Sequence, residues 1–77
     1  MVYRNLKAEM ARAGLTNEKL AQKLGMTKQA VGQKILGHKN WYLEHMTKIQ
    51  DILENELGQR FSLDYLFETF EDNNEEE

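Results

Sequence analysis

Apolar residues recur every three or four positions along most of this 77-residue chain, which contains no proline. This spacing places them along one side of an α-helix, and no alternating pattern typical of a β-strand competes with it. Proline interrupts helices, so its absence leaves the helical pattern unbroken. The sequence therefore predicts an all-α fold. It also predicts one domain, because a single core usually spans about 50 to 200 residues.

Five helical segments are predicted from this spacing and from the residues that begin helices. Thr16 or Asn17 is expected to cap the second segment, and Thr27 the third, because short polar side chains accept hydrogen bonds from first-turn amides. With their caps, the predicted segments are residues 3–13, 16–24, 27–36, 43–53 and 63–70.

The buried faces follow from the same spacing. The third segment is expected to bury Val31 and Ile35. The side chains expected to be buried by the last two segments are Leu43, Met46, Ile49, Leu53, Leu63, Leu66, Phe67 and Phe70. The C-terminal apolar cluster either closes the bundle or forms a dimer surface; it consists of Phe61, Leu63, Leu66, Phe67 and Phe70.

Charge is distributed unevenly, although the formal net charge is only −3. Residues 1–39, the basic half, contain eight Lys or Arg and two acidic residues, a charge of +6. Residues 40–77, the acidic half, contain two Lys or Arg and eleven acidic residues, a charge of −9. Such asymmetry suggests that the basic half binds a polyanion. Residues 71–77 have no apolar side chain, and we expect a disordered acidic tail beyond a domain of residues 1–70.

The chain contains no cysteine. It has no disulfide framework, as in a reducing compartment, and we expect a cytoplasmic protein. The N-terminal segment lacks the apolar stretch of a signal peptide. No apolar run approaches the roughly 18 residues that would cross a bilayer. Neither secretion by that route nor a membrane partner is expected.

Catalysis is not expected either. His38 and His45 are the only imidazoles, and Ser62 is the only serine. A zinc site without cysteine would need carboxylate ligands beside these histidines, and a catalytic triad lacks its parts. The glycines mark helix ends and form no phosphate-binding loop. The sequence predicts no metal and no cofactor.

Residues 17–36 carry the most specific pattern. Gly25 permits a sharp turn between two short helices, and the small side chain of Ala21 lets these helices cross closely. This arrangement is a predicted helix-turn-helix. Its second helix exposes amide and ammonium groups and no carboxylate, and it fits a DNA major groove about 12 Å wide. There, Gln can pair with adenine and Lys can donate to guanine.

Residues 14–40, GLTNEKLAQKLGMTKQAVGQKILGHKN, resemble the helix-turn-helix of the Cro and repressor family of phage and bacterial transcription regulators, also called the xre family. WYLEHMTKIQDIL and SLDYLF resemble the fourth helix and the final apolar segment of small phage-type members. The resemblance implies a compact five-helix bundle of the lambda-repressor type, operator binding through the third helix, and commonly a two-fold homodimer. The residues that hold the family's spacing are Leu20, Ala21, Leu24, Gly25, Val31 and Gly37.

The resemblance also assigns individual DNA contacts. Gln29 and Gln33 stand at the base-reading positions, with Lys28 just ahead of them. Asn17 opens the second helix, where the family contacts a phosphate, and a helix N-terminus favours an anion. In any other helix, these side chains would be ordinary solvated surface.

Two positions depart from the family pattern. Gly32 replaces a common Ser or Thr, and it either weakens base recognition or allows a close approach to DNA. Lys34 replaces a buried aliphatic residue, so its stem is expected to pack while its exposed head contacts a backbone phosphate. Trp41 and Tyr42 are expected to pack in the core. The full set of predicted DNA-contact residues is Asn17, Thr27, Lys28, Gln29, Gly32, Gln33, Lys34, Lys39 and Asn40.

The leading functional hypothesis is a sequence-specific transcription regulator that binds an inverted-repeat operator in double-stranded DNA. One alternative is a helical interaction module that binds a protein partner through its acidic half. Another is the antitoxin of a toxin–antitoxin pair, which binds both DNA and a protein. The absence of carboxylates from the third segment favours DNA binding over the pure interaction module.

Overall fold

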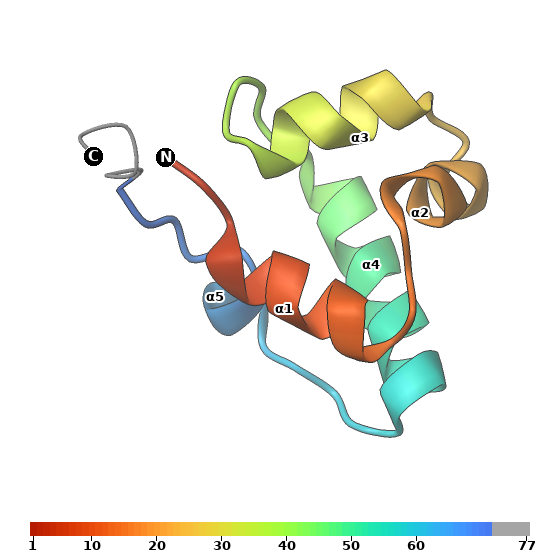
Figure 1. The fold of residues 1–77 in the computed structure, drawn as a ribbon. Coiled ribbons are helices and arrows are strands. Elements are labelled where there is room, and N and C mark those ends of the chain that lie inside the picture. The colour runs from red at the N-terminus through yellow and green to blue at the C-terminus, as the bar shows by residue number, and fades with distance from the viewer. Residues whose placement is uncertain (72–77) are drawn as a thin grey trace.

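Helices form in this chain where an apolar stripe coincides with residues that begin and end a helix. The computed structural model describes residues 1–71, which contain five helices and no strand, so the predicted all-α fold is confirmed for this part of the chain (Figure 1). All but the first residue of the predicted acidic tail lies outside the described residues. The helices are α1 (Arg4–Arg12), α2 (Asn17–Leu24), α3 (Lys28–Ile35), α4 (Leu43–Leu57) and α5 (Leu63–Leu66).

Side-chain caps define the starts of α2 and α3. Thr16, and not Asn17, caps α2, because its hydroxyl accepts a hydrogen bond of 3.1 Å from the amide of Lys19. Thr27 caps α3 in the same way, with a 3.0 Å bond from the amide of Ala30. Both threonines precede helices in extended backbone, which is the usual conformation of a capping residue.

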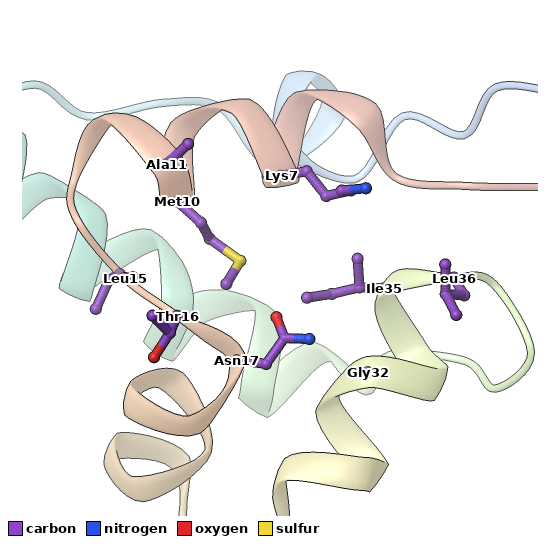
Figure 2. A pocket seen from close by; sticks show the side chains of 9 residues that line it. All are labelled: Lys7, Met10, Ala11, Leu15, Thr16, Asn17, Gly32, Ile35 and Leu36. Carbon is purple, nitrogen blue, oxygen red and sulfur yellow. The ribbon is translucent and has the colours of Figure 1, made fainter.

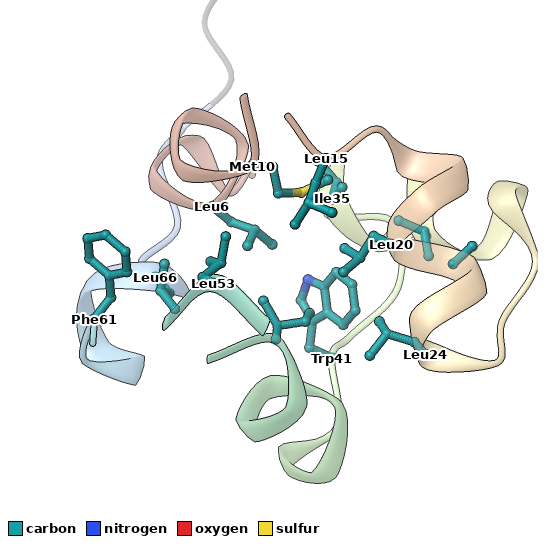
Figure 3. Close-up of a cluster of buried hydrophobic side chains, with 13 residues drawn as sticks. Leu6, Met10, Leu15, Leu20, Leu24, Ile35, Trp41, Leu53, Phe61 and Leu66 are labelled. Atoms are coloured by element: carbon teal, nitrogen blue, oxygen red, sulfur yellow. The ribbon is translucent and has the colours of Figure 1, made fainter. Parts of the chain in front are cut away.

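One core joins all five helices (Figure 3). The radius of gyration of the Cα atoms is 12.0 Å, close to the roughly 11 Å expected of a compact domain of this length. Trp41 lies inside this core, so its predicted packing role is confirmed. Each helix supplies at least one fully buried side chain; these are Leu6, Leu20, Val31, Ile49, Leu53 and Leu66.

The helices divide into two groups around this core. α2 and α3 are joined by a short turn and pack against each other. α1 crosses α4 and also contacts α5 (Figure 1).

Within residues 1–71, no helix is long and apolar enough to cross a membrane.

α4 differs from its predicted extent. It continues four residues beyond residue 53 and ends at Gly58, whose positive φ of 69° stops the helix. Leu43 was expected to be buried, but 65% of it is exposed, so that prediction is wrong. Ile49 and Leu53 are four residues apart and share one face of α4, whereas Leu43 precedes Ile49 by six residues and is therefore rotated about 120° away from it around the helix axis.

α5 is shorter than predicted, because Phe70 is not helical. Two backbone hydrogen bonds of 2.9 Å pair Phe70 with Val2 in an isolated antiparallel bridge. This pairing requires extended backbone at Phe70, and α5 itself ends earlier, at Leu66. The two ends of the described chain therefore lie side by side.

Candidate nucleic-acid interface

The outer face of α3 carries the side chains that the sequence assigned to base recognition. Lys28, Gln29 and Gln33 are exposed, while Val31 and Ile35 are buried against the core. Gln29 and Gln33 are four residues apart, so they project from the same side of the helix, one turn from each other. α3 contains no carboxylate, so its exposed face can approach an anion without repulsion.

The junction of α2 and α3 holds this face in place. Gly25 ends α2 with a φ of 72°, a left-handed conformation that glycine adopts without steric cost. The amide of Met26 then donates a 2.9 Å hydrogen bond to the carbonyl oxygen of Ala21. The turn is thus fixed by backbone bonds, and α3 leaves it at an angle to α2 (Figure 1).

Gly32 lies at a close approach between α3 and the start of α2. A Cβ atom added at Gly32 would lie 3.7 Å from the side-chain nitrogen of Asn17, an ordinary contact distance. Gly32 is therefore only partly exposed and faces Asn17. The structure brings these two predicted site residues together, although they are far apart in the sequence.

A surface pocket of about 310 Å³ opens beside this contact, between α1, the start of α2 and the second half of α3 (Figure 2). Its walls are mainly apolar, and its polar groups come from Lys7, Thr16 and Asn17. None of the lining residues is acidic. They are Lys7, Met10, Ala11, Leu15, Thr16, Asn17, Gly32, Ile35 and Leu36.

Lys34 does not lie where the sequence predicted. It was expected to expose its head, but the residue is only 7% exposed, so this expectation is wrong. Its Nζ donates a 2.6 Å hydrogen bond to the carbonyl oxygen of Asn40, and it lies 5.7 Å from the ring centre of Trp41 and 4.8 Å from that of Tyr42. A carbonyl and two aromatic faces thus replace water around the ammonium group. Lys34 fixes the loop after α3 and does not point outward.

Tyr42 also departs from its prediction. It was expected to pack with Trp41, but 66% of Tyr42 is exposed, while Trp41 is only 7% exposed. The ring of Tyr42 instead covers Lys34 from the outside. Lys39 and Asn40 are exposed in the same loop, as the sequence predicted, and the side chain of Thr27 is exposed while it caps α3.

Lys7 is a candidate that sequence reasoning missed. It is exposed on α1 and lines the pocket with Asn17. Arg4 precedes it by three residues and is also exposed, so both cations lie on one side of α1. The three-residue spacing of Arg4 and Lys7 was visible in the sequence, but it did not connect them to the helix-turn-helix. Only the fold places α1 beside α2 and α3.

The perturbed ionisable groups lie away from this surface. The hydroxyl of Tyr65 donates a 2.7 Å hydrogen bond to the buried carboxylate of Glu9, which raises the pKa of Tyr65 above its ordinary value. Glu9 also accepts a 2.6 Å bond from Arg12. Hydrogen bonds to Glu54 and Asp51 raise the pKa of Arg60. The Tyr65–Glu9 bond thus joins α5 to α1, and Arg60 ties the loop after α4 back to that helix.

Metal binding has no candidate in the described part of the chain, where no three His, Asp or Glu side chains gather around a common point.

Comparison with known proteins gives no match to any family model, curated protein or solved structure.

Proposed function

We propose that this protein is a sequence-specific double-stranded DNA-binding transcription regulator, similar to the Cro and repressor family, with α2 and α3 as its helix-turn-helix. The observation that carries the proposal is the exposed face of α3, where Lys28, Gln29 and Gln33 lie together without a carboxylate. Eight helical residues span about 12 Å, a length that the major groove accommodates.

Base contacts and backbone contacts have separate positions in this proposal. Gln29 and Gln33 contact base edges, because glutamine amides can both donate to and accept from adenine. Asn17, Lys7 and Lys39 contact phosphates on the two sides of the groove, where side chains fix the register of the protein on DNA. Lys34 has no place among these contacts, because its ammonium group is bound to the Asn40 carbonyl.

The proposal includes a two-fold homodimer on an inverted repeat, as the resemblance implies, with half-sites about one helical turn of DNA apart. A cytoplasmic location is part of the proposal, because a bacterial or phage operator lies in that compartment. The protein needs no cofactor for this function, since side chains alone provide the contacts.

Duplex selection followed by salt titration tests the proposal. Fragments bound from random duplex DNA are sequenced, and the affinity for the enriched sequence is measured over a range of salt concentrations. We expect the slope of log K against log salt to steepen by about 0.9 for every phosphate neutralised. A slope near zero in the folded protein would rule out DNA binding.

Matched lysine variants locate the interface in the same assay. Lys39→Ala should reduce the magnitude of the slope by about one, because one phosphate contact is lost. Lys48→Ala removes an exposed lysine from α4, outside the proposed interface, and should leave the slope unchanged. Equal effects of the two substitutions would show that only net charge matters.

A further inference from the structure

The pocket beside Asn17 separates two helices that pack mainly against other parts of the fold. α1 has its principal contacts with α4 and α5, whereas α3 has its own with α2. The pocket floor is apolar, because Met10, Leu15 and Ile35 line it and are each more than nine-tenths buried. Figure 2 shows Met10, Asn17 and Ile35 pointing into the space between α1 and α3. An apolar group that enters this space leaves water and contacts the core.

The apolar surface continues from the floor of the pocket onto its rim. Leu36 also lines the pocket, but it is 49% exposed, whereas Ile35 before it is buried. A ligand with an apolar body can therefore cover Leu36 as well as the floor. The pocket volume of about 310 Å³ lies at the lower end of the range for ligand sites, roughly 300 to 1,000 Å³, so the ligand is small.

The polar side chains of the pocket can all donate to an anion. Lys7 is exposed and forms no ion pair within residues 1–71. The hydroxyl oxygen of Thr16 accepts from the amide of Lys19, which leaves the hydroxyl hydrogen to donate elsewhere. The side-chain amide of Asn17 supplies two N–H donors. One cation and two neutral donors match a single carboxylate, which carries one negative charge on two acceptor oxygens.

We propose that this pocket binds a small carboxylate with an apolar body, and that this ligand competes with the DNA backbone. The carboxylate lies beside Lys7 and Asn17, while the apolar body contacts the floor and Leu36. The proposed function assigns Lys7 and Asn17 to phosphates, so the ligand and DNA exclude each other at these two side chains. The competition with DNA rests on the proposed function, whereas the binding of the ligand does not.

Amide NMR titrations with hexanoate test the binding without DNA. Acetate carries the same charge without the chain, and 1-hexanol carries the chain without the charge. We expect saturable shifts at Lys7, Ala11 and Asn17 with hexanoate, and at least fivefold weaker binding of the other two compounds. Equal binding of all three compounds, no saturable shift, or shifts confined to the exposed Tyr42 and Leu43 outside the pocket would overturn the site.

Matched lysine variants test the position of the carboxylate. Lys7→Gln removes the charge and should weaken hexanoate binding about fivefold, while the binding of 1-hexanol stays unchanged. Lys48→Gln removes the same charge from an exposed position on α4 and should change neither. Equal losses in both variants would attribute the effect to net charge, and an unchanged affinity in Lys7→Gln would remove Lys7 from the site; either result contradicts the assigned contact.

Duplex binding in the presence of each acid tests the competition. Hexanoate and acetate are compared at the same concentration, so both samples have the same ionic strength and equal screening. Hexanoate at ten times its measured Kd should weaken the apparent affinity for the duplex about tenfold. Equal effects of hexanoate and acetate would overturn the competition. If the protein binds no duplex, the proposed function fails, while the NMR titrations still decide whether the pocket binds the ligand.

Discussion

The basic and acidic halves share one core but use their surface charges differently. Within residues 1–71, Arg12 is the only cation of the basic half that forms an ion pair, and its partner is the buried Glu9. In the acidic half, Arg60 binds both Asp51 and Glu54. The acidic half thus neutralises part of its charge locally, whereas the basic half leaves most of its cations exposed. An unpaired basic surface remains available to a polyanion.

The halves also differ in what their helices contribute to the core. α2 and α3 are short, and a three-residue turn and two threonine caps fix their mutual position. α4 is the longest helix, and its Ile49 and Leu53 are fully buried against residues from the basic half. The acidic half therefore supports the basic half, and damage to it should abolish whatever the basic half binds.

The largest expected effect tests this dependence. Leu66→Ala leaves a cavity at a fully buried position of α5 and should lower the free energy of unfolding by about 2 to 5 kcal/mol. Denaturant unfolding measures the change, and Leu43→Ala is the control, because that leucine is 65% exposed. The control should change stability by less than about 0.5 kcal/mol. A similar loss in both variants would contradict the described core.

The next effect concerns recognition by the basic half. Gln29→Ala or Gln33→Ala should weaken binding to the preferred operator by about 1 to 3 kcal/mol and relax base preference at one position of each half-site. Competition binding against single-base operator variants measures both changes. Gln59→Ala removes an exposed glutamine from the acidic half and should change neither. An unchanged order of preference in both α3 variants would exclude α3 as the helix that recognises bases.

The smallest effect concerns the hydrogen bond between Tyr65 and Glu9, which joins the acidic half to the basic half. Tyr65→Phe removes the donor to buried Glu9 and should cost about 1 kcal/mol of stability. Because the pKa of folded Tyr65 is raised, this contribution is present in full below pH 10 and is lost as pH rises through the folded pKa.

Unfolding measured from pH 8 to 11 checks the sign, with the exposed Tyr42→Phe as the control. The difference between wild type and Tyr65→Phe should shrink towards pH 11, whereas the Tyr42→Phe variant should follow the wild type throughout. A pH-independent difference for Tyr65→Phe would show that the hydroxyl is not bound to a carboxylate.

Local signals allowed most of the helices to be predicted from sequence. Thr27 and Gly25 define the limits of α2 and α3 through their own backbone preferences, so no distant contact was needed to place them. The end of α5 could not be predicted in this way. Phe70 continues the helical spacing, but it pairs with Val2, and no local pattern reports a contact between opposite ends of the chain.

The candidate site was predictable to a similar extent. The exposure of Gln29 and Gln33 follows from the burial of Val31 and Ile35, which the helical period predicts. The burial of Lys34 was missed, because its ammonium group is satisfied by a carbonyl and two rings that meet only in the folded chain. Lys7 was missed because it lies on α1 and reaches the site only through a pocket that α1 forms with α2 and α3 in the folded chain.

The pairing of Val2 with Phe70 also bears on the order of events during synthesis. A chain is made from its N-terminus, so Val2 has no partner until residue 70 has been added. This contact closes the longest loop of the described chain and has the largest entropic cost of closure. Val2 is therefore the last part of the N-terminal segment to find its partner, next to Tyr3, which donates a hydrogen bond to Ile35 at the end of α3. A nascent chain can form α2 and α3 before this N-terminal segment is held in place.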